Sequence, residues 1–201
     1  MILASRNRHK VRELDEILRG VGLQPLPEEV ELPPEDGDTF TANAMVKARA
    51  ARAATGEPVI ADDSGLVVDG LGGRPGVSSA RYAGEQASDG ENLEKVLRDL
   101  AASHGPPTAR YVCVIAAIDG EGREATFEGT CEGRMIRRPR GKGGFGYDPA
   151  FVPDDTGPGD ERTMAELTPD EKNAISHRGR AARALAEYLA GGSSTRGESK
   201  A

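Results

Sequence analysis

The sequence predicts a single domain of the α/β class, in which strands and helices alternate along the chain. Short apolar runs rich in β-branched residues are typical of buried strands, and they recur between segments with the 3.6-residue apolar period of helices. No internal repeat is visible, and 201 residues can bury the core of one domain, which we expect to span residues 1–190. The small polar residues of segment 191–201 predict a disordered tail.

The composition is typical of a soluble protein that does not bind nucleic acid stably. The net charge of −7 argues against a surface that coats nucleic acid. No apolar run approaches the roughly 18 residues that a membrane span needs, and the amino terminus lacks a signal-peptide pattern. Cys113 and Cys131 have no metal-ligand spacing, so we expect free thiols in a cytoplasmic protein, with a disulfide as the less favoured alternative.

Residues 1–4 are predicted to form a first strand that turns into a helix over about residues 8–19. Ser5 or Asn7 is expected to cap this helix. The basic residues gathered in the turn are Arg6, Arg8, His9 and Lys10. Because cations at a helix N-terminus are unfavourable for the helix itself, the turn predicts an anion site, such as one for phosphate. A merely solvated basic turn is the alternative.

An acidic loop at residues 23–38 precedes a second helix. Thr39 or Asp38 is expected to cap this alanine-rich helix, which we predict to end near residue 54. Asn43 and Lys47 are four residues apart in it, so they share one face of the helix.

Two adjacent carboxylates follow an apolar run at residues 59–61. We expect this run to be a buried strand that delivers Asp62 and Asp63 to its carboxyl end, with a second short strand at residues 66–69. Neighbouring carboxylates repel each other and lose hydration on burial, so they need a cation, a proton or a base nearby. Mg²⁺ would meet this need, since it takes one or two carboxylates together with substrate phosphates. A solvated Asp-Asp-Ser-Gly turn is the alternative.

The second half of the chain contains further strands and two glycine-rich loops. The loop at residues 70–84 is too long for a plain turn, and a helix is expected after Ser88 or Asp89. The nearly continuous apolar run at residues 110–118 predicts a central strand, and the alternation at residues 124–136 predicts its antiparallel partner with one wetter face.

A second basic, glycine-rich loop at residues 137–149 carries Phe145 and Tyr147. An aromatic ring in such a loop can stack on a nucleobase, or Phe145 can simply fill the core below the loop. Residues 169–172 then begin a helical turn, and residues 175–178 lead into the last predicted helix.

Five separated stretches together resemble the inosine triphosphate pyrophosphatases, over about residues 1–190. They are SRNRHK at 5–10, ADDSGL at 61–66, GRPGVSSARYAG at 73–84, GGFGYDP at 143–149 and EKNAISHRG at 171–179. Enzymes of this family hydrolyse deaminated purine nucleoside triphosphates to monophosphate and pyrophosphate. The resemblance implies a long twisted mixed sheet with helical lobes beside a central nucleotide cleft, a homodimer, and dependence on Mg²⁺.

The resemblance also assigns roles to individual residues. Asp63 matches the catalytic carboxylate and Ser64 the adjacent substrate contact, while Glu35 and Asp63 match the metal ligands, with Asp62 as a further candidate. The residues implied to bind the triphosphate are Ser5, Arg6, Asn7, Arg8, His9, Lys10 and Lys47. The residues implied to bind the nucleoside and its base are Phe145, Gly146, Tyr147, Asp148, Lys172, His177 and Arg178.

Three expectations follow for the chemistry. Asp63 would orient or deprotonate the water that attacks the α-phosphorus. Lys172, His177 and Arg178 are rich in donors, and we expect no carboxylate matched to them, so they would favour a 6-oxo purine over adenine. Ala42 stands where relatives usually carry glutamate, which moves any metal contact toward Glu35. The alternatives are a pyrophosphatase for other modified or pyrimidine nucleotides and a non-catalytic nucleotide sensor.

Overall fold

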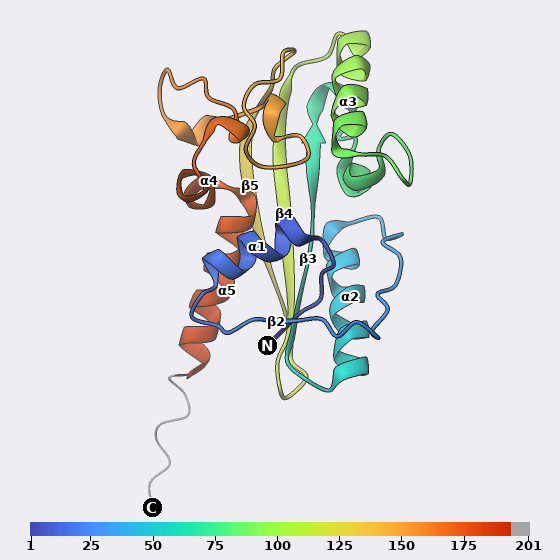
Figure 1. The fold of residues 1–201 in the computed structure, drawn as a ribbon, viewed down its shortest axis with the longest axis vertical. Helices are drawn as coiled ribbons and strands as arrows, with labels where there is room; N and C mark the ends of the chain where they lie inside the picture. Colours follow the sequence, from blue (N-terminus) through green and yellow to red (C-terminus); the bar gives the residue numbers. More distant parts are fainter. Residues whose placement is uncertain (194–201) are drawn as a thin grey trace, which may run out of the picture.

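A six-stranded mixed sheet forms the centre of the computed structural model, which describes residues 1–193 (Figure 1). The strands are β1 (Ile2–Leu3), β2 (Gln24–Pro25), β3 (Val59–Val68), β4 (Thr108–Ile118), β5 (Glu124–Met135) and β6 (Phe151–Pro153). Their spatial order is β2-β1-β3-β4-β5-β6, with β1 parallel to both neighbours and the later pairs antiparallel. The predicted α/β class and mixed sheet are therefore confirmed, and β4 is central as expected.

The prediction of two short strands around the paired carboxylates was wrong. Residues 59–68 form one strand, β3, and every residue of it pairs with β4. Asp62 and Asp63 therefore lie in the middle of the strand and not at its carboxyl end. Ser64 and Gly65 suggested a turn, but pairing with the long apolar β4 determines the local structure instead. Gly65 is needed for packing, since a Cβ there would lie 2.5 Å from the carbonyl oxygen of Gly76.

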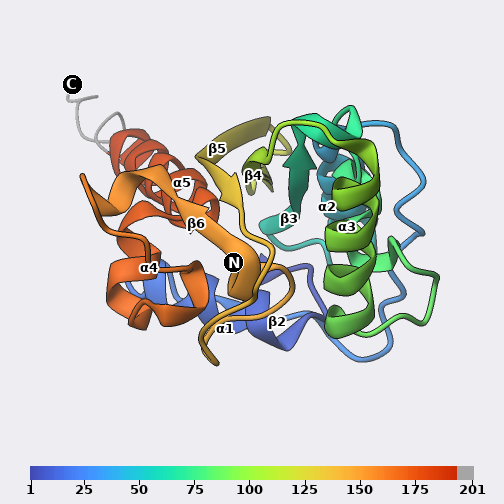
Figure 2. The same ribbon diagram turned by 90° about the horizontal axis from the view of Figure 1, so that it is seen from above.

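Helices cover both faces of the sheet. Seen from above in Figure 2, α1 (Arg8–Ile17), α4 (Pro169–Ile175) and α5 (His177–Ser193) lie on one side, and α2 (Phe40–Thr55) and α3 (Asp89–Ser103) lie on the other. Five 3₁₀ turns connect these elements, at Asp69–Leu71, Gly76–Arg81, Asp148–Ala150, Asp154–Thr156 and Met164–Glu166. One core cluster joins α2 to Val59 and Ala61, and another joins α1 and α5 to Ile60 and Ile115. Alternate residues of β3 therefore face different helices.

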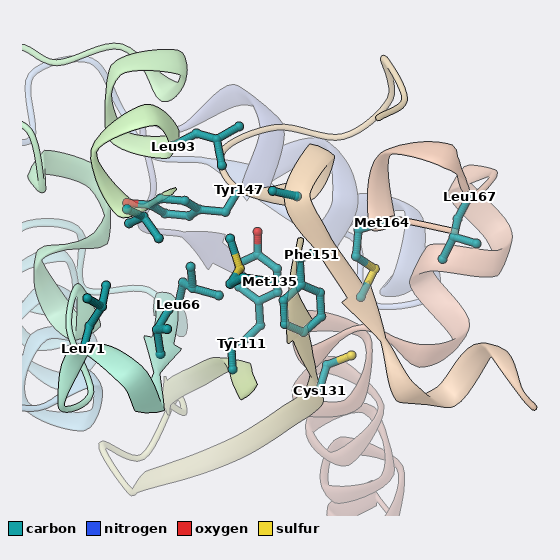
Figure 3. Packing of buried hydrophobic residues seen from close by; sticks show 14 residues of the cluster. Leu66, Leu71, Leu93, Tyr111, Cys131, Met135, Tyr147, Phe151, Met164 and Leu167 are labelled. Carbon is teal, nitrogen blue, oxygen red and sulfur yellow. The ribbon is translucent and has the colours of Figure 1, made fainter. Parts of the chain in front are cut away.

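A third core cluster joins α3 and strands β3 to β6 to Met164 and Leu167 (Figure 3). Tyr111 is in this cluster, with its ring 4.8 Å from that of Phe151, and Tyr147 is buried in it. Tyr147 also donates its hydroxyl to the carbonyl of Ser79 at 2.7 Å. Tyr147 thus anchors the end of the second glycine-rich loop in the core.

The predicted helix starts are confirmed at three positions. The Asn7 side chain accepts hydrogen bonds from the amides of His9 and Lys10, Thr39 caps α2, and Ser88 forms a capping box with Glu91. At the other end of the chain, α5 continues through residues 191–193, which the composition had suggested were part of the tail. The remainder of the predicted disordered tail, residues 194–201, lies outside the described residues.

Candidate active site

Most of the predicted site residues meet in one cleft beside the middle of β3. The predicted residues that line it are Asn7, Lys10, Glu35, Asp63, Ser64, Phe145, Gly146, Tyr147, Asp148, Lys172, His177 and Arg178. An adjoining cavity shares Asn7, Lys10 and Glu35, and adds Ser5, Arg6 and Lys47. The cleft therefore has a basic end near α1 and an aromatic end near loop 137–149. Arg8 lines neither cavity.

The two neighbouring aspartates occupy opposite faces of the sheet. Asp63 faces α2, where its Oδ2 accepts a hydrogen bond from Asn43 Nδ2 at 2.9 Å. Asp62 faces α1 and α5, with its Oδ2 3.1 Å from Lys10 Nζ. The expectation that the two carboxylates share one site was wrong, because successive residues of a strand point to opposite sides. Asp62 is consequently not on the side of Asp63 and Glu35 where a shared cation would bind.

The surroundings give the two aspartates opposite protonation behaviour. Burial raises the pKa of Asp63 above its ordinary value, and the carboxylate of Glu35 raises it further, although Lys10 and Lys47 oppose both effects. Burial also disfavours the charged form of Asp62, but Lys10, Arg178 and Lys47 together hold its pKa at about 2. Asp63 is thus the better proton acceptor, and Asp62 is a permanent anion.

Glu35 and Lys47 lie beside Asp63. The Lys47 ammonium is buried and donates to Glu35 Oε1 and to the backbone carbonyl of Asp62. Within residues 1–193 no group of three or more His, Cys, Asp or Glu side chains is arranged to hold a metal ion. Two carboxylates, Asp63 and Glu35, nevertheless line the same cleft. That donor set fits Mg²⁺, which commonly takes one or two protein carboxylates and completes its shell with substrate phosphates and water.

The basic turn is divided between structural and cleft-facing residues. The Arg6 guanidinium donates to the carbonyls of Leu26, Pro27 and Val30, at 2.8, 2.5 and 3.0 Å. It therefore ties the acidic loop 23–38 to the turn, a role that the sequence did not predict. Lys10 lines both cavities, and its side chain is 14% exposed.

Phe145 forms the aromatic end of the cleft. It is half-buried and belongs to none of the hydrophobic clusters, so it does not act as the core plug considered from sequence. The His9 ring stacks against it, with centroids 5.0 Å apart and an interplanar angle of 16°. The Lys172 ammonium and the Arg178 guanidinium also lie over the ring, at 5.0 and 5.5 Å from its centroid.

The cations at this end have carboxylate partners, which corrects the expectation that they lack them. Lys172 Nζ lies 2.6 Å from Asp148 Oδ2 and 2.8 Å from Glu13 Oε1, and Glu13 also pairs with Arg178. Glu13 is buried on α1 although its sequence context suggests a solvated residue. Its position three residues after Lys10, on the same helical face, is the one signal that could have indicated it.

His177 is held as a neutral imidazole. Its ring is buried and stacks on Tyr111, with centroids 4.6 Å apart. Burial lowers the pKa of His177 well below its ordinary value, and the nearby charges of Arg178 and Lys172 lower it further. Its Nδ1 has no hydrogen-bond partner among the described residues. Tyr111, which no sequence motif singled out, donates its hydroxyl to Asp148 Oδ1 at 3.1 Å.

The fold and the cleft define an α/β protein with a basic and an aromatic subsite beside the buried carboxylate of Asp63. The Ham1 family model matches residues 1–188. A solved HAM1 protein from Coxiella burnetii superposes with a TM-score of 0.84 at 44% identity, covering 94% of this chain and 97% of that one. The Staphylococcus aureus Ham1 protein gives 0.83 at 38% identity, with the same coverage.

Curated relatives are similar over nearly their whole length. The dITP/XTP pyrophosphatase of Bacillus subtilis is 49% identical over 197 residues, covering 94% of this chain and 96% of the relative. That of Halalkalibacterium halodurans is 46% identical over 196 residues, covering 94% and 97%. This chain therefore belongs to the Ham1 family, which confirms the resemblance found in the five sequence stretches. Among the described residues, no helix is both long and apolar enough to cross a membrane.

Proposed function

We propose that this protein hydrolyses deaminated purine nucleoside triphosphates, namely dITP, ITP and XTP or dXTP, to the monophosphate and pyrophosphate. The observation that carries the proposal is the composition of one cleft. It combines a buried carboxylate of raised pKa, cations at one end, and an aromatic ring with hydrogen-bonding groups at the other. The names of the relatives from B. subtilis and H. halodurans support the same reaction.

The basic end would hold the β- and γ-phosphates as the leaving group. Lys10 lines both cavities and Lys47 lines the second, so both can approach a triphosphate that extends from the cleft. Asp63 would orient a water molecule and accept its proton as the water oxygen bonds to the α-phosphorus. The bond from the α-phosphorus to the bridging oxygen breaks, and pyrophosphate leaves. Such reactions depend mainly on positioning and charge stabilisation, which suits a site with few reactive groups.

Glu35 and Asp63 are the residues that would hold Mg²⁺. The ion would neutralise charge on the phosphate oxygens as it develops. Chelation with EDTA should abolish turnover and added Mg²⁺ should restore it. A binding readout independent of activity is the Mg²⁺ affinity of the resting protein, which Glu35→Gln should weaken without unfolding the chain. Unchanged affinity would exclude Glu35 as a ligand.

The aromatic end would hold the nucleoside. Phe145 offers a ring face for stacking, and Lys172, His177 and Arg178 would read the 6-oxo group of the base. Glu13 and Asp148 pair with Lys172 and Arg178 and orient them beside the base, so a mismatched base would leave buried donors without the acceptor that the 6-oxo group provides. Arg178→Ala should therefore lower kcat/KM for dITP more than for dATP. An equal loss for both substrates would mean that Arg178 does not read the base.

Hydrolysis in ¹⁸O-labelled water tests the bond that is cleaved. With dITP as substrate, we expect the label in the monophosphate and none in pyrophosphate. Label in released orthophosphate would mean cleavage at the γ-phosphorus. A panel that includes dUTP and methylated nucleotides distinguishes the alternative substrates, and binding without any product would indicate a nucleotide sensor.

We also propose that the protein acts in the cytoplasm as a homodimer without stable nucleic-acid binding. Cys113 and Cys131 are both free and buried, which suits a reducing compartment. The net charge of −7 opposes a polyanionic partner. Light scattering coupled to size exclusion measures the assembly directly, and a mass near 21.2 kDa would indicate a monomer.

A further inference from the structure

A chain of alternating charges connects the two ends of the cleft. In order from the basic end to the aromatic end, its members are Lys10, Asp62, Arg178, Glu13, Lys172 and Asp148. Three cations alternate with three carboxylates, so the chain is neutral as a whole. Because every member except Lys10 is buried, a change at one end is poorly screened by water before it reaches the other.

One contact in this chain is incomplete. Asp62 Oδ2 lies 3.8 Å from Arg178 Nε, which is beyond hydrogen-bonding distance. Neither oxygen of Asp62 has a hydrogen-bond partner among the described residues, and neither does Arg178 Nε, although all three atoms are buried. The ion pair with Lys10 is the closest contact that Asp62 makes with a cation, and buried polar atoms without a hydrogen bond are costly, so Asp62 and Arg178 would gain from moving together.

Lys10 is the member of the chain that can respond to phosphate. Its ammonium is paired with Asp62 at 3.1 Å, yet its side chain lines both cavities. A triphosphate that draws Lys10 away leaves the fully buried Asp62 with Arg178 as its nearest cation. Closing that contact to the usual charge-assisted distance of roughly 2.8 Å would move Arg178 by about 1 Å. Arg178 also donates from Nη2 to Ser64 Oγ at 3.0 Å and pairs with Glu13, so its guanidinium would shift within the base end.

We propose that Asp62 is a positioning residue that couples phosphate binding to base recognition, by exchanging Lys10 for Arg178 as its partner when a triphosphate engages Lys10. This inference rests on the proposed function. Arg178 reaches its base-reading position only while phosphates hold Lys10. Once pyrophosphate has left, Lys10 pairs with Asp62 again and Arg178 moves back from Asp62. The binding of the monophosphate product is then weaker. Asp62 itself is fully buried and lines neither cavity, so it acts through Lys10 and Arg178.

Calorimetric titration with the two halves of the substrate measures this coupling. Inosine carries the base without phosphates, and inorganic tripolyphosphate carries the phosphates without a base. In the wild-type protein, saturating tripolyphosphate should tighten inosine binding by roughly 5- to 150-fold, the usual range of coupling between two sites. Inosine should tighten tripolyphosphate binding by the same factor, because the coupling is reciprocal.

Asp62→Asn should bring this factor close to one while both ligands still bind. Cys113→Ala is the matched control, since it alters a buried, uncharged side chain beside Asp62 and Arg178 and should leave the coupling intact. A coupling factor near one in the wild-type protein would overturn the inference. The absence of measurable inosine binding at any tripolyphosphate concentration would overturn it as well. So would full coupling in Asp62→Asn. Pyrophosphate release from dITP is measured separately. If inosine and tripolyphosphate bind independently while pyrophosphate release is normal, the coupling is rejected and the proposed function remains.

A second measurement needs only wild-type protein, in case Asp62→Asn does not fold. The Nε–H resonance of Arg178 in a ¹⁵N–¹H spectrum, assigned by its loss in Arg178→Lys, should move when tripolyphosphate alone is added. A downfield proton shift is expected because Nε–H gains a carboxylate acceptor. A resonance that stays in place at saturating tripolyphosphate contradicts the partner exchange.

Discussion

At the scale of single residues, the cleft depends on the one-residue difference between Asp62 and Asp63. The strand turns Asp63 toward Asn43 and Asp62 toward Lys10, and the two carboxyl groups acquire opposite pKa shifts. The same residue type therefore provides a proton acceptor on one face of β3 and a permanent counter-ion on the other. The protonation state of each aspartate is thus determined by the residues around it, which the Asp-Asp sequence alone does not specify.

Asp63→Asn should reduce kcat for dITP by roughly 100-fold or more, the scale expected for a positioned acid–base group. Thermal stability should hold or rise, because burial disfavours the charge that the substitution removes. Steady-state kinetics and calorimetric melting measure the two effects. Asp69→Asn, just beyond the end of β3, is the control and should retain wild-type turnover. Near-normal turnover in Asp63→Asn would remove Asp63 from the mechanism.

Asn43→Ala should move the acid limb of the kcat/KM profile to higher pH. Burial raises the pKa of Asp63, and the hydrogen bond from Asn43 is one of the contacts that lower it. Losing this donor should raise the pKa further, so the base would become protonated at a higher pH. A pH–rate profile of both proteins measures the shift. An acid limb that stays fixed, or moves to lower pH, would show that Asp63 is not the group being titrated.

At the scale of elements, α5 brings His177 and Arg178 to the cleft by packing closely on β5. Gly129 of β5 permits this approach, since a Cβ there would lie 2.2 Å from the carbonyl oxygen of His177 and 2.6 Å from the amide of Ala181. Both contacts involve backbone, which cannot rotate away as a side chain can. The position of one glycine in a strand thus determines where the base-reading residues lie.

Gly129→Ala should destabilise the protein by about 1–3 kcal/mol, the usual effect of overpacking, and should raise KM for dITP by displacing the start of α5. Gly120→Ala is the matched control. A Cβ at position 120 would have no other atom within 4 Å, so the stability of this variant should change by at most about 0.5 kcal/mol. Denaturant unfolding measures the change in stability, and steady-state kinetics measure the change in KM for dITP. Equal stability of the two variants would mean that α5 tolerates displacement from β5.

Sequence patterns predicted the elements better than the contacts between them. Periodicity and capping residues located the helices, and the long apolar run located β4, because these signals are local. Ser64 and Gly65 misled the prediction of β3, since pairing with β4 is a tertiary effect. Glu13 was missed for a related reason. Its partners, Lys172 and Arg178, are distant in sequence, and no local rule connects them.

At the scale of the whole molecule, the buried charges make stability depend on pH. His177 is neutral in the folded protein, with a pKa well below its ordinary 6.5. As the pH falls below 6.5, the unfolded chain therefore binds more protons than the folded protein does. The stability from neutral His177 is present above pH 6.5 and is lost as the pH falls toward its folded pKa. Asp62 adds a second window, since its pKa falls from 3.8 to about 2 on folding and its contribution is lost between these values.

The free energy of unfolding should therefore decline below pH 6.5, with His177 contributing up to about 1.4 kcal/mol per pH unit. In His177→Phe this part of the slope should vanish, while the loss near the pKa of Asp62 should remain. Urea unfolding between pH 7 and pH 5 measures the part due to His177, and extending it from the ordinary pKa of Asp62, 3.8, down to about 2 measures the part due to Asp62. Parallel curves would show that His177 is not the group that protonates on unfolding.

The contact between Glu13 and Arg178 also has a consequence for biosynthesis. The two residues are 165 positions apart in the chain, and α5, which carries Arg178, is the last element among residues 1–193. A ribosome therefore releases β1, α1 and β3 well before the residues that complete the base end exist. A nascent chain that stops before residue 177 has the basic turn and Asp63 but lacks His177 and Arg178, which line the cleft from α5. Nucleotide binding should thus begin only after His177 and Arg178 have been synthesised and α5 has packed, so shorter fragments would not sequester nucleotides.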